Sequence, residues 1–210
     1  LSSKVIQSPV ADVMVQALCA GIRQQGLNKL NWSKHLLGLR QRADFMHQLN
    51  PNEWPALDDQ ALTDALEDWL APFLNGLKKL EAIDADCLQQ GLHYYLGYDK
   101  LRQIDELVPS HFTVPSGSNI RLDYASGEPV LAVRLQEIFG LLETPKIAQG
   151  KMPILVHLLS PAQRPVQVTR DLASFWAETY PQVKKELKGR YPKHYWPDDP
   201  YTAEAIRGVR

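Results

Sequence analysis

The sequence has few cysteines, no long apolar run and no N-terminal targeting signal. Its two cysteines, Cys19 and Cys87, lie far apart in helix-like patterns and form no CxxC pair, so they predict neither a disulfide framework nor a zinc site. No stretch approaches the roughly 18 consecutive apolar residues that a membrane-spanning helix needs. Residues 1–10 lack the basic flank and apolar segment of a signal peptide. We therefore expect a cytoplasmic protein with reduced, buried cysteines, and the start at Leu1 instead of Met indicates a piece of a longer chain.

Motifs that mark common catalytic sites are also missing. There is no GxxxxGKS/T phosphate loop, GxGxxG turn, HExxH helix or GxSxG elbow, so neither nucleotide hydrolysis nor motif-marked hydrolase chemistry is supported. The six histidines show no HxH or i,i+4 ligand pair, and His157, inside an apolar run, fits a structural role. The pairs Glu67-Asp68 and Asp198-Asp199 fit solvated surface better than a general acid and base. We predict no catalytic residue, metal site or cofactor in this chain.

Composition and charge describe an ordinary globular protein with an uneven charge distribution. With 44% hydrophobic and 22% charged residues, the chain can form one large domain or two small ones. Residues 1–110 carry 10 Lys and Arg against 14 Asp and Glu, whereas residues 111–210 carry 13 against 10. This asymmetry indicates a polyanionic partner for the second half. A solvated surface whose charges balance by chance fits the same numbers.

Apolar residues at helical spacing predict that residues 1–108 form a helical assembly. Ser8-Pro9 supplies an N-cap and a first-turn proline, and the apolar pattern continues to Gly26. A second run from Trp32 ends at Asn50-Pro51, because a residue before proline disfavours the helical conformation. Aspartates before apolar runs predict three further helices, capped by Asp58 or Asp59, by Asp84 and by Asp99.

The pattern changes at Pro109 from helical spacing to short β-type runs. Residues 111–114 and 119–124 predict strands on either side of a Pro-Ser-Gly-Ser turn. Residues 153–159 and 166–169 predict two paired strands around a second proline-containing turn. The second half of the chain is therefore expected to supply nearly all of the β-structure.

Two helices and a tail complete the prediction. Residues 129–140 begin like a strand but carry apolar residues spaced like one helix face, and we predict a short helix there. Thr169 or Asp171 caps a helix that restarts at Pro181 and stops at Gly189. The last 20 residues predict an irregular tail, docked by its aromatics at the start and mobile at the end. The predicted class is α+β, with a helical region at 1–108, a small β-barrel-like domain with helices at 109–190 and a tail at 191–210.

One positive chemical signature lies near the C-terminus, where cations alternate with aromatic rings. The residues are Tyr180, Lys184, Lys185, Lys188, Arg190, Tyr191, Lys193, His194, Tyr195 and Trp196. Cations neutralise phosphates and aromatic faces stack on bases, so the mixture suits single-stranded nucleic acid. The alternative is that the aromatics pin the tail to the domain while the lysines are merely solvated.

The second half also contains a series of distinctive short segments. They are Ser110–Ser118, Ile120–Tyr124, Val133–Gly140, Leu158–Ala162, Arg164–Leu172 and Lys188–His194, followed by Trp196-Pro197. In this order they closely resemble the C-terminus of HrpB-type bacterial ATP-dependent helicases over residues 110–200. The segment Trp69-Leu70-Ala71-Pro72 resembles the preceding region of the same family.

The resemblance implies a parent protein of the DExH-box helicase superfamily, with two RecA-like motor domains N-terminal to this chain. ATP and magnesium would belong to that motor. The motifs do not decide between RNA and DNA, and our expectation is RNA. Members of this superfamily carry accessory domains after the motor, among them oligonucleotide-binding folds. By analogy, residues 109–190 are expected to be a small barrel of oligonucleotide-binding type.

We therefore predict an accessory region that binds single-stranded nucleic acid and guides it for the motor. The candidate phosphate contacts are Arg121, Arg164, Arg170, Lys184, Lys185, Lys188, Arg190 and Lys193, and the candidate stacking residues are Tyr191 and Trp196. The alternative function is a protein-interaction module anchored by Trp176, Tyr195 and Trp196. Salt separates the two, because phosphate binding weakens steeply with ionic strength and an apolar anchor does not.

Overall fold

The computed structural model describes residues 9–208, which fall into two compact units divided between Ile104 and Asp105. The predicted N-cap at Ser8 lies outside the described residues. The predicted domain boundary at Pro109 stays a prediction, because compactness alone does not show that either part folds independently.

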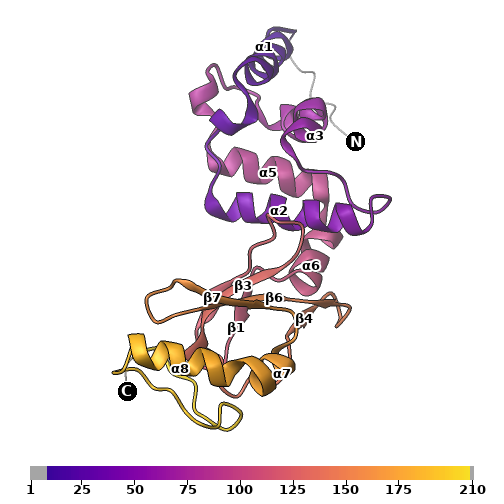
Figure 1. Ribbon diagram of the computed structural model, residues 1–210. Helices are drawn as coiled ribbons and strands as arrows, with labels where there is room; N and C mark the ends of the chain where they lie inside the picture. The colour runs from indigo at the N-terminus through magenta and orange to yellow at the C-terminus, as the bar shows by residue number, and fades with distance from the viewer. Residues whose placement is uncertain (1–8, 209–210) are drawn as a thin grey trace. The chain divides into compact units, whose positions relative to one another are not determined.

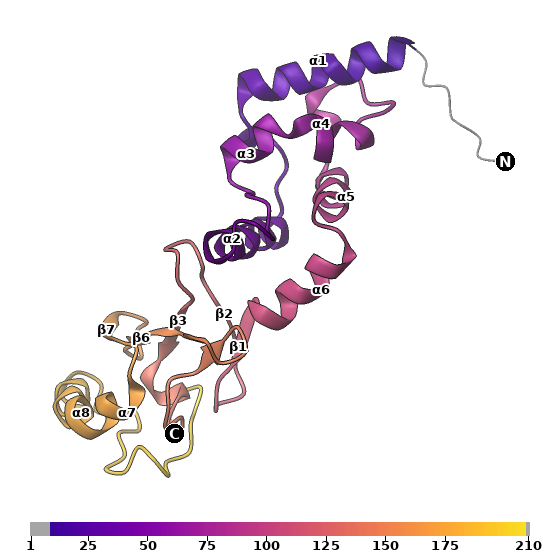
Figure 2. The same ribbon diagram turned by 90° about the vertical axis from the view of Figure 1, so that its right-hand side faces the viewer.

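The first unit is built from helices joined by short 3-10 turns (Figure 1), which confirms the predicted helical assembly. The α-helices are α1 (Pro9–Gln25), α2 (Lys34–Leu49), α3 (Asp59–Asp64), α4 (Leu66–Trp69) and α5 (Ala85–Leu96). A further helix, α6 (Tyr98–Leu107), contains the division between the units. The 3-10 turns are η1 (Leu27–Lys29), η2 (Ala71–Phe73) and η3 (Leu80–Ala82). In Figure 2, α1 lies across the top of α3 and α4.

Side-chain caps determine where several of these helices begin. Ser33, Asp58 and Asp84 each accept hydrogen bonds from backbone N–H groups in the first turns of α2, α3 and α5. These bonds satisfy donors that have no partner within the helix. Of the two residues predicted as the cap of α3, Asp58 is the one that caps it.

Two of the predicted helices differ in detail from the structure. Asp99 does not cap α6, because α6 begins at Tyr98, directly after Gly97 with its φ of 79°. The helix predicted after Asp58 is interrupted at Ala65 and continues as α4. Both differences arise at single residues where the backbone leaves the helical conformation.

Trp69 is buried in the first unit and forms a hydrogen bond across the interruption at Ala65. Its side chain is fully buried, and its Nε1 donates a hydrogen bond to the carbonyl oxygen of Leu62 at 2.8 Å. The indole of Trp69 therefore binds the Leu62 carbonyl close to the point where the helix is interrupted at Ala65. Gly91 in α5 packs directly on Trp69, because a Cβ at this glycine would lie 2.7 Å from the Trp69 carbonyl oxygen.

The second unit contains small sheets with helices beside them. Its strands are β1 (His111–Thr113), β2 (Asn119–Arg121), β3 (Val130–Arg134), β4 (Lys146–Ile147), β5 (Met152–Pro153), β6 (Leu155–Leu159) and β7 (Pro165–Thr169). β1 and β2 form an antiparallel hairpin, and so do β4 and β5. In the sheet of order β3-β6-β7, β3 is parallel to β6 and β7 is antiparallel to it. The strands predicted in 111–114 and 119–124 are present, although β2 ends at Arg121. The predicted pairing of 153–159 with 166–169 is confirmed by β6 and β7, although β6 begins only at Leu155.

The predicted helix over residues 129–140 is wrong. Residues 130–134 form β3, and a 3-10 turn, η4 (Leu135–Glu137), follows. Leu131 and Val133 alternate with more exposed neighbours along the strand, and both are buried against the rest of the unit. Pairing with β6 overrides a local pattern that fits one helix face, because strand and turn direct their apolar residues into the same core.

The predicted barrel is corrected in part. Among the described residues the strands form separate sheets of two, three and two strands, and none closes on itself. The helices α7 (Leu172–Ser174) and α8 (Tyr180–Arg190), joined by the π-helical turn η5 (Phe175–Thr179), lie along one side of the β3-β6-β7 sheet in Figures 1 and 2. A helical layer therefore covers this sheet where a barrel would place further strands.

The C-terminal helix begins where the sequence indicates but ends later. Asp171 accepts a hydrogen bond from the backbone N–H of Ser174 at 3.0 Å and caps α7, which decides between the two predicted caps. α8 begins at Tyr180, one residue before the predicted restart. Gly189 does not stop the helix, because α8 continues to Arg190 and Gly189 keeps a negative φ.

The tail is irregular, as predicted, but it is docked over most of its length. Tyr180 Oη donates to the Pro197 carbonyl at 2.8 Å, and the Gly140 N–H donates to the Pro200 carbonyl at 2.9 Å. Further along, the N–H of Ile206 bonds to Gln136, and the Arg207 guanidinium bonds to the Ser116 carbonyl. The predicted mobile end is therefore corrected for residues up to 207, which hydrogen bonds hold on the unit.

Candidate nucleic-acid interface

The cations of α8 lie on two flanks of the helix. Tyr180, Val183 and Leu187 are buried and face the unit. Residues four apart share one side of a helix, so Lys184 lies with Lys188 on one flank, and Glu186 lies with Arg190 on the other. Arg190 therefore lies on a different flank of α8 from Lys184 and Lys188.

Lys184 is the least available of the α8 lysines. Its Nζ donates to the Asp198 carboxylate in the tail, and only 19% of its side chain is exposed. This hydrogen bond and the Lys184 charge hold the pKa of Asp198 below its usual value. In contrast, Lys185 and Lys188 are exposed and form no ion pair within the described residues. The charge of Lys184 is thus offset by Asp198, whereas Lys185 and Lys188 face solvent.

Two other predicted phosphate contacts lie away from α8. Arg170 follows β7, and its guanidinium binds both carboxylate oxygens of Glu128 at 2.7 and 2.8 Å. Such a bidentate pair orients the guanidinium and offsets its charge. Arg121 is exposed at the end of β2. Neither residue belongs to the group around the end of α8.

Arg164 and Arg190 come together at a small pocket between the β6–β7 turn and the end of α8. The pocket has a volume of about 150 Å³ and is lined by Ser160, Arg164, Pro165, Val166, Glu186, Leu187, Arg190 and Tyr191. Both arginines are exposed and form no ion pair in the part of the chain that the structure describes. Two positive charges are therefore available at one edge of the unit.

Tyr191 connects the two walls of this pocket. It caps the C-terminus of α8, where its N–H bonds to the Leu187 carbonyl at 2.7 Å. Its hydroxyl lies 3.4 Å from the Ser160 Oγ, which also accepts a hydrogen bond from the Arg164 N–H at 3.2 Å. The ring is half-buried and in edge contact with His194. The predicted stacking residue Tyr191 is thus held in place beside both arginines.

Trp196, the other predicted stacking residue, is buried. Only 8% of it is exposed, and its Nε1 donates to the Tyr191 carbonyl at 2.9 Å. Its ring has no free face for a base, and its position supports Tyr191 instead. Trp176 is buried too, so two of the three anchors proposed for protein interaction are core residues.

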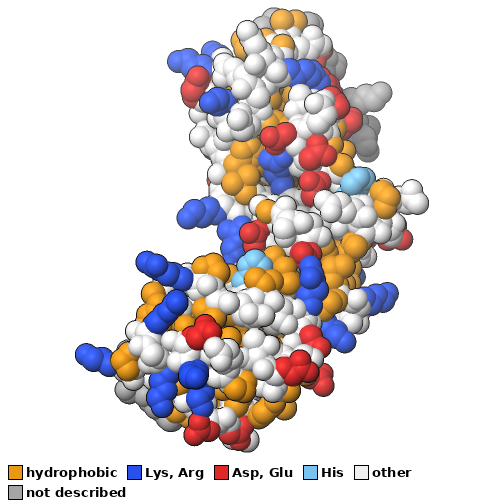
Figure 3. Space-filling view, in the orientation of Figure 1, with side chains coloured by type: hydrophobic (Ala, Val, Ile, Leu, Met, Phe, Trp, Pro, Cys, Tyr) orange, Lys and Arg blue, Asp and Glu red, His pale blue; other side chains and the backbone are white. Residues whose placement is uncertain are grey.

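We call Arg164, Lys185, Lys188, Arg190, Tyr191 and Lys193 the α8-end surface. All five cations in it are exposed. In Figure 3, blue side chains gather on the side of the second unit where the β6–β7 turn and the end of α8 lie in Figure 1. Of the predicted set, the structure brings Arg164, Arg190 and Tyr191 together at the pocket. Trp196 is buried behind Tyr191, and the charges of Arg170 and Lys184 are offset by ion pairs.

Comparison with known proteins identifies the family. Residues 69–200, more than half of the chain, match the family model described as "ATP-dependent helicase C-terminal", HrpB_C. The chain belongs to this family. The resemblance seen in the sequence is thereby confirmed.

Relatives of the HrpB C-terminal family agree in sequence and in structure. The chain is 45% identical to "ATP-dependent RNA helicase HrpB" of Escherichia coli (strain K12) over 98% of its own length and 26% of the relative's. Crystal structures titled "E. coli DExH-box NTPase HrpB" and "Escherichia coli DEAH/RHA helicase HrpB" match with TM-scores of 0.83 and 0.70, at 44% and 41% identity. These matches cover 96% and 93% of this chain and 25% of each solved chain. The chain thus spans about a quarter of the relatives it matches.

Two residues that line the pocket at the end of α8, Ser160 and Glu186, were missed by the sequence prediction. Ser160 precedes a proline in the β6–β7 turn, and its burial follows from its bonds across that turn. Glu186 stands four residues before Arg190, a spacing that places both on one flank. The helical spacing therefore contained a signal for Glu186, whereas the role of Ser160 depends on the tertiary fold.

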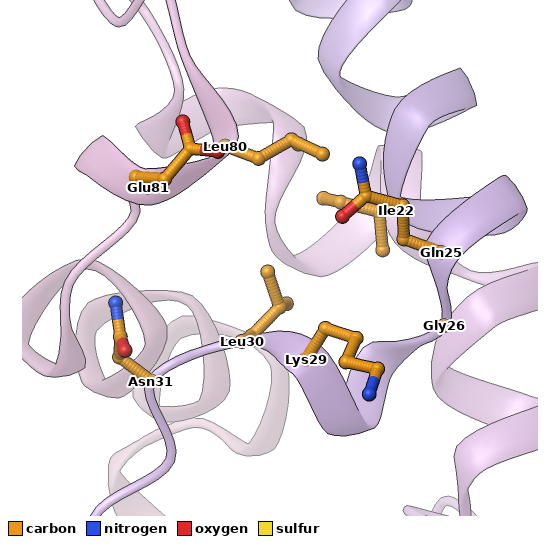
Figure 4. A pocket seen from close by; sticks show the side chains of 8 residues that line it. All are labelled: Ile22, Gln25, Gly26, Lys29, Leu30, Asn31, Leu80 and Glu81. Atoms are coloured by element: carbon orange, nitrogen blue, oxygen red, sulfur yellow. The ribbon is translucent and has the colours of Figure 1, made fainter.

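The first unit of this HrpB-family chain has a separate pocket of about 150 Å³ (Figure 4). Figure 4 shows Ile22, Leu30 and Leu80 directed into the space, while the Lys29 ammonium points away from it. The mixed lining favours no particular ligand.

Within the described residues no group of three or more His, Cys, Asp or Glu could hold a metal ion. None of the described helices is long and apolar enough to cross a membrane.

The two cysteines of this chain are free thiols. Cys19 is buried and Cys87 is half-buried. Burial raises the pKa of both thiols above the ordinary value for cysteine. They are therefore poor nucleophiles, in keeping with the structural role expected from the sequence.

Proposed function

We propose that this chain is the C-terminal accessory region of an ATP-dependent RNA helicase and that its α8-end surface holds single-stranded RNA for the motor. The Escherichia coli relative is an ATP-dependent RNA helicase, and this chain spans 26% of that protein's length. The motor, with its ATP and magnesium, would lie in the parts of the parent outside this chain and act in the cytoplasm. This region would act as a guide without chemistry of its own.

One observation carries the proposal: two exposed arginines, which form no ion pair within the described residues, line one pocket together with Tyr191. Arg164 and Arg190 lie at the pocket that Tyr191 lines, and Lys188 lies in the last turn of α8. Cations replace the counterions of a phosphate backbone, and an aromatic face stacks on bases of any sequence. A surface of this kind binds a strand without opening a duplex or hydrolysing ATP.

The arrangement of the strands is compatible with an open relative of the oligonucleotide-binding fold, which we include in the proposal. The bridge between Asp123 and Val130 connects the β1–β2 hairpin to β3, and β3 continues through β6 to β7. An oligonucleotide-binding fold is a partly open barrel of five strands. In this interpretation the helical layer of α7 and α8 replaces the closure of the barrel.

The remaining candidates make smaller contributions in this proposal. Arg170 and Lys184 have their charges offset by Glu128 and Asp198. Arg121 lies at the end of β2 and would contact RNA only if the bound RNA extends to the β1–β2 hairpin. We therefore expect the salt dependence of binding to come mainly from the five cations of the α8-end surface.

Salt-dependent RNA binding tests the proposal. Fluorescence anisotropy with a labelled, unstructured RNA is measured over a potassium chloride series for the wild-type chain and for a triple variant, Lys185→Ala, Lys188→Ala and Lys193→Ala. Each lost phosphate contact removes about 0.7 from the log–log slope on a single strand, so the triple variant should flatten the slope by about 2 units. All three side chains are exposed, so the variant should unfold like the wild type.

A matched control removes the same charge from the first unit. Lys78, Lys79 and Arg102 are also exposed, and their replacement by alanine should leave the slope unchanged. Equal slopes for the two triple variants would contradict the proposal. Binding that ignores salt altogether would instead favour the protein-interaction alternative.

A further inference from the structure

The pocket at the end of α8 contains a carboxylate that a simple phosphate-binding site would not need. Glu186 lines it together with Arg164, Arg190 and Tyr191. We propose that this pocket binds one unpaired guanine base of the RNA strand. The inference rests on the proposed function and adds base selectivity to the same surface.

The Glu186 carboxylate is positioned as a hydrogen-bond acceptor. Gln182 Nε2 donates to its Oε1 at 2.8 Å, which orients the group and leaves lone pairs free on both oxygens. No ion pair of Glu186 occurs within the described residues. A carboxylate repels a phosphate but accepts hydrogen bonds from a base that offers N–H donors.

Guanine is the base that matches this acceptor best. Its N1–H and N2 amino group stand side by side on the Watson–Crick edge, so both can donate to one carboxylate. Adenine and cytosine offer one amino group next to an acceptor nitrogen, and uracil offers one imino group between two carbonyls. Proteins commonly read splayed-out RNA bases on this edge. The acceptor therefore selects for guanine over the other three bases.

Tyr191 and the two arginines complete the recognition. The Tyr191 ring is held at its hydroxyl end near Ser160 and at its backbone as the cap of α8, so it offers a preformed stacking surface. Arg164 comes from the β6–β7 turn and Arg190 from the end of α8, on the two walls of the pocket. In this arrangement the base enters between them and the phosphates on its two sides meet the guanidinium groups.

The size of the pocket fits a single base. Its volume of about 150 Å³ resembles that of cavities known to admit one benzene ring, and its open side leaves room for the second ring of a purine. A base pair is too large for this space. The site therefore requires an unpaired nucleotide, which agrees with a strand already separated by a motor.

Base substitution in a short RNA tests the inference on the full chain. Uracil-rich RNAs of about nine nucleotides, a length within the range of single-strand binding sites, carry guanine, inosine, adenine, cytosine or uracil at the centre. Anisotropy should show the central guanine binding on the order of fivefold tighter than uracil, since a good bidentate contact discriminates by at least that factor. Inosine, which lacks the amino group, should fall between them.

Glu186→Gln is the diagnostic variant, because it keeps the shape and removes the pure acceptor. It should abolish the guanine preference while overall affinity stays equal or rises. Glu178→Gln, an exposed carboxylate in η5, removes the same charge elsewhere in the unit and should keep the preference.

Four outcomes are distinguishable. A guanine preference lost only in Glu186→Gln supports the inference. Equal binding of all five RNAs with a normal salt slope overturns the guanine pocket and leaves the proposed function standing. A preference that survives in Glu186→Gln overturns the assignment to Glu186, and the absence of RNA binding overturns the proposed function itself.

Discussion

Two arginines of the first unit and two of the second have different surroundings. In the first unit, Arg23 binds Glu67 through both carboxylate oxygens, and Arg40 binds Asp59 while lying over the ring of Trp32. In the second unit, Arg164 and Arg190 face a pocket and form no ion pair among the described residues.

The number of cations in a region therefore says little about binding. What matters is whether each charge is already offset by a neighbour, because an offset cation gains less from meeting a phosphate. The ion pair of Arg23 with Glu67 also raises the pKa of Arg23 and lowers that of Glu67, which shows how closely the two charges are coupled. What the second unit adds is Arg164 and Arg190 beside Tyr191, both exposed and without an ion pair among the residues that the structure describes.

The largest effect is expected in the first unit, where packing dominates. Gly91→Ala would place a Cβ 2.7 Å from the Trp69 carbonyl oxygen and 2.9 Å from its ring. Such overpacking should lower the free energy of unfolding by about 2 kcal/mol or more. Urea unfolding followed by tryptophan fluorescence measures it. RNA affinity of the folded protein should not change, and an unaltered midpoint would show that α5 does not pack this closely on Trp69.

The comparison between arginines can be tested by two matched double variants. Arg164→Gln with Arg190→Gln should flatten the salt slope of RNA binding by about 1.4 units, from roughly 0.7 per contact, with little change in stability. Arg23→Gln with Arg40→Gln should show the opposite pattern, because those arginines are engaged in ion pairs and a cation–π contact. Anisotropy and urea melts of both variants give the two readouts. Identical behaviour of the pairs would remove the distinction between the units.

A smaller effect of opposite sign is expected at the end of α8. Gly189 lies within the helix, and a Cβ there would meet no atom within 4 Å. Gly189→Ala should therefore raise the free energy of unfolding by about 0.5–1 kcal/mol, the usual gain at an unhindered helical glycine. Thermal melts measure the change. Destabilisation would restore Gly189 as a helix stop and place Arg190 outside the helix.

The smallest effect concerns the tail and Lys184. Asp198→Asn removes the carboxylate that pairs with this lysine, which should make it available to a phosphate. The salt slope of RNA binding should steepen by about 0.7, one additional contact on a single strand. Anisotropy at several salt concentrations measures it, with Asp199→Asn as control. A slope unchanged in Asp198→Asn would exclude Lys184 from the interface.

Much of the fold is determined by local sequence. Asp58, Asp84 and Asp171 cap helices wherever they stand before an apolar run, because a short acidic side chain reaches the free N–H groups of the first turn. The alternating run at 119–124 predicts a half-exposed strand for the same local reason. The basic and aromatic composition of residues 180–196 predicts a surface for a polyanion, which stays a prediction.

Other features of the molecule depend on contacts between residues far apart in the chain, and only the tertiary structure determined them. Residues 130–134 form a strand because β6 supplies the partner for their backbone groups, although their apolar spacing also fits a helix. Trp196 becomes a core residue because the tail folds back on the unit. Lys184 is already occupied by its ion pair with Asp198, which stands fourteen residues later in the chain. Arg164 and Arg190 meet at one pocket because the β6–β7 turn lies beside the end of α8. Burial and charge pairing depend on neighbours distant in the chain, and local sequence cannot specify them.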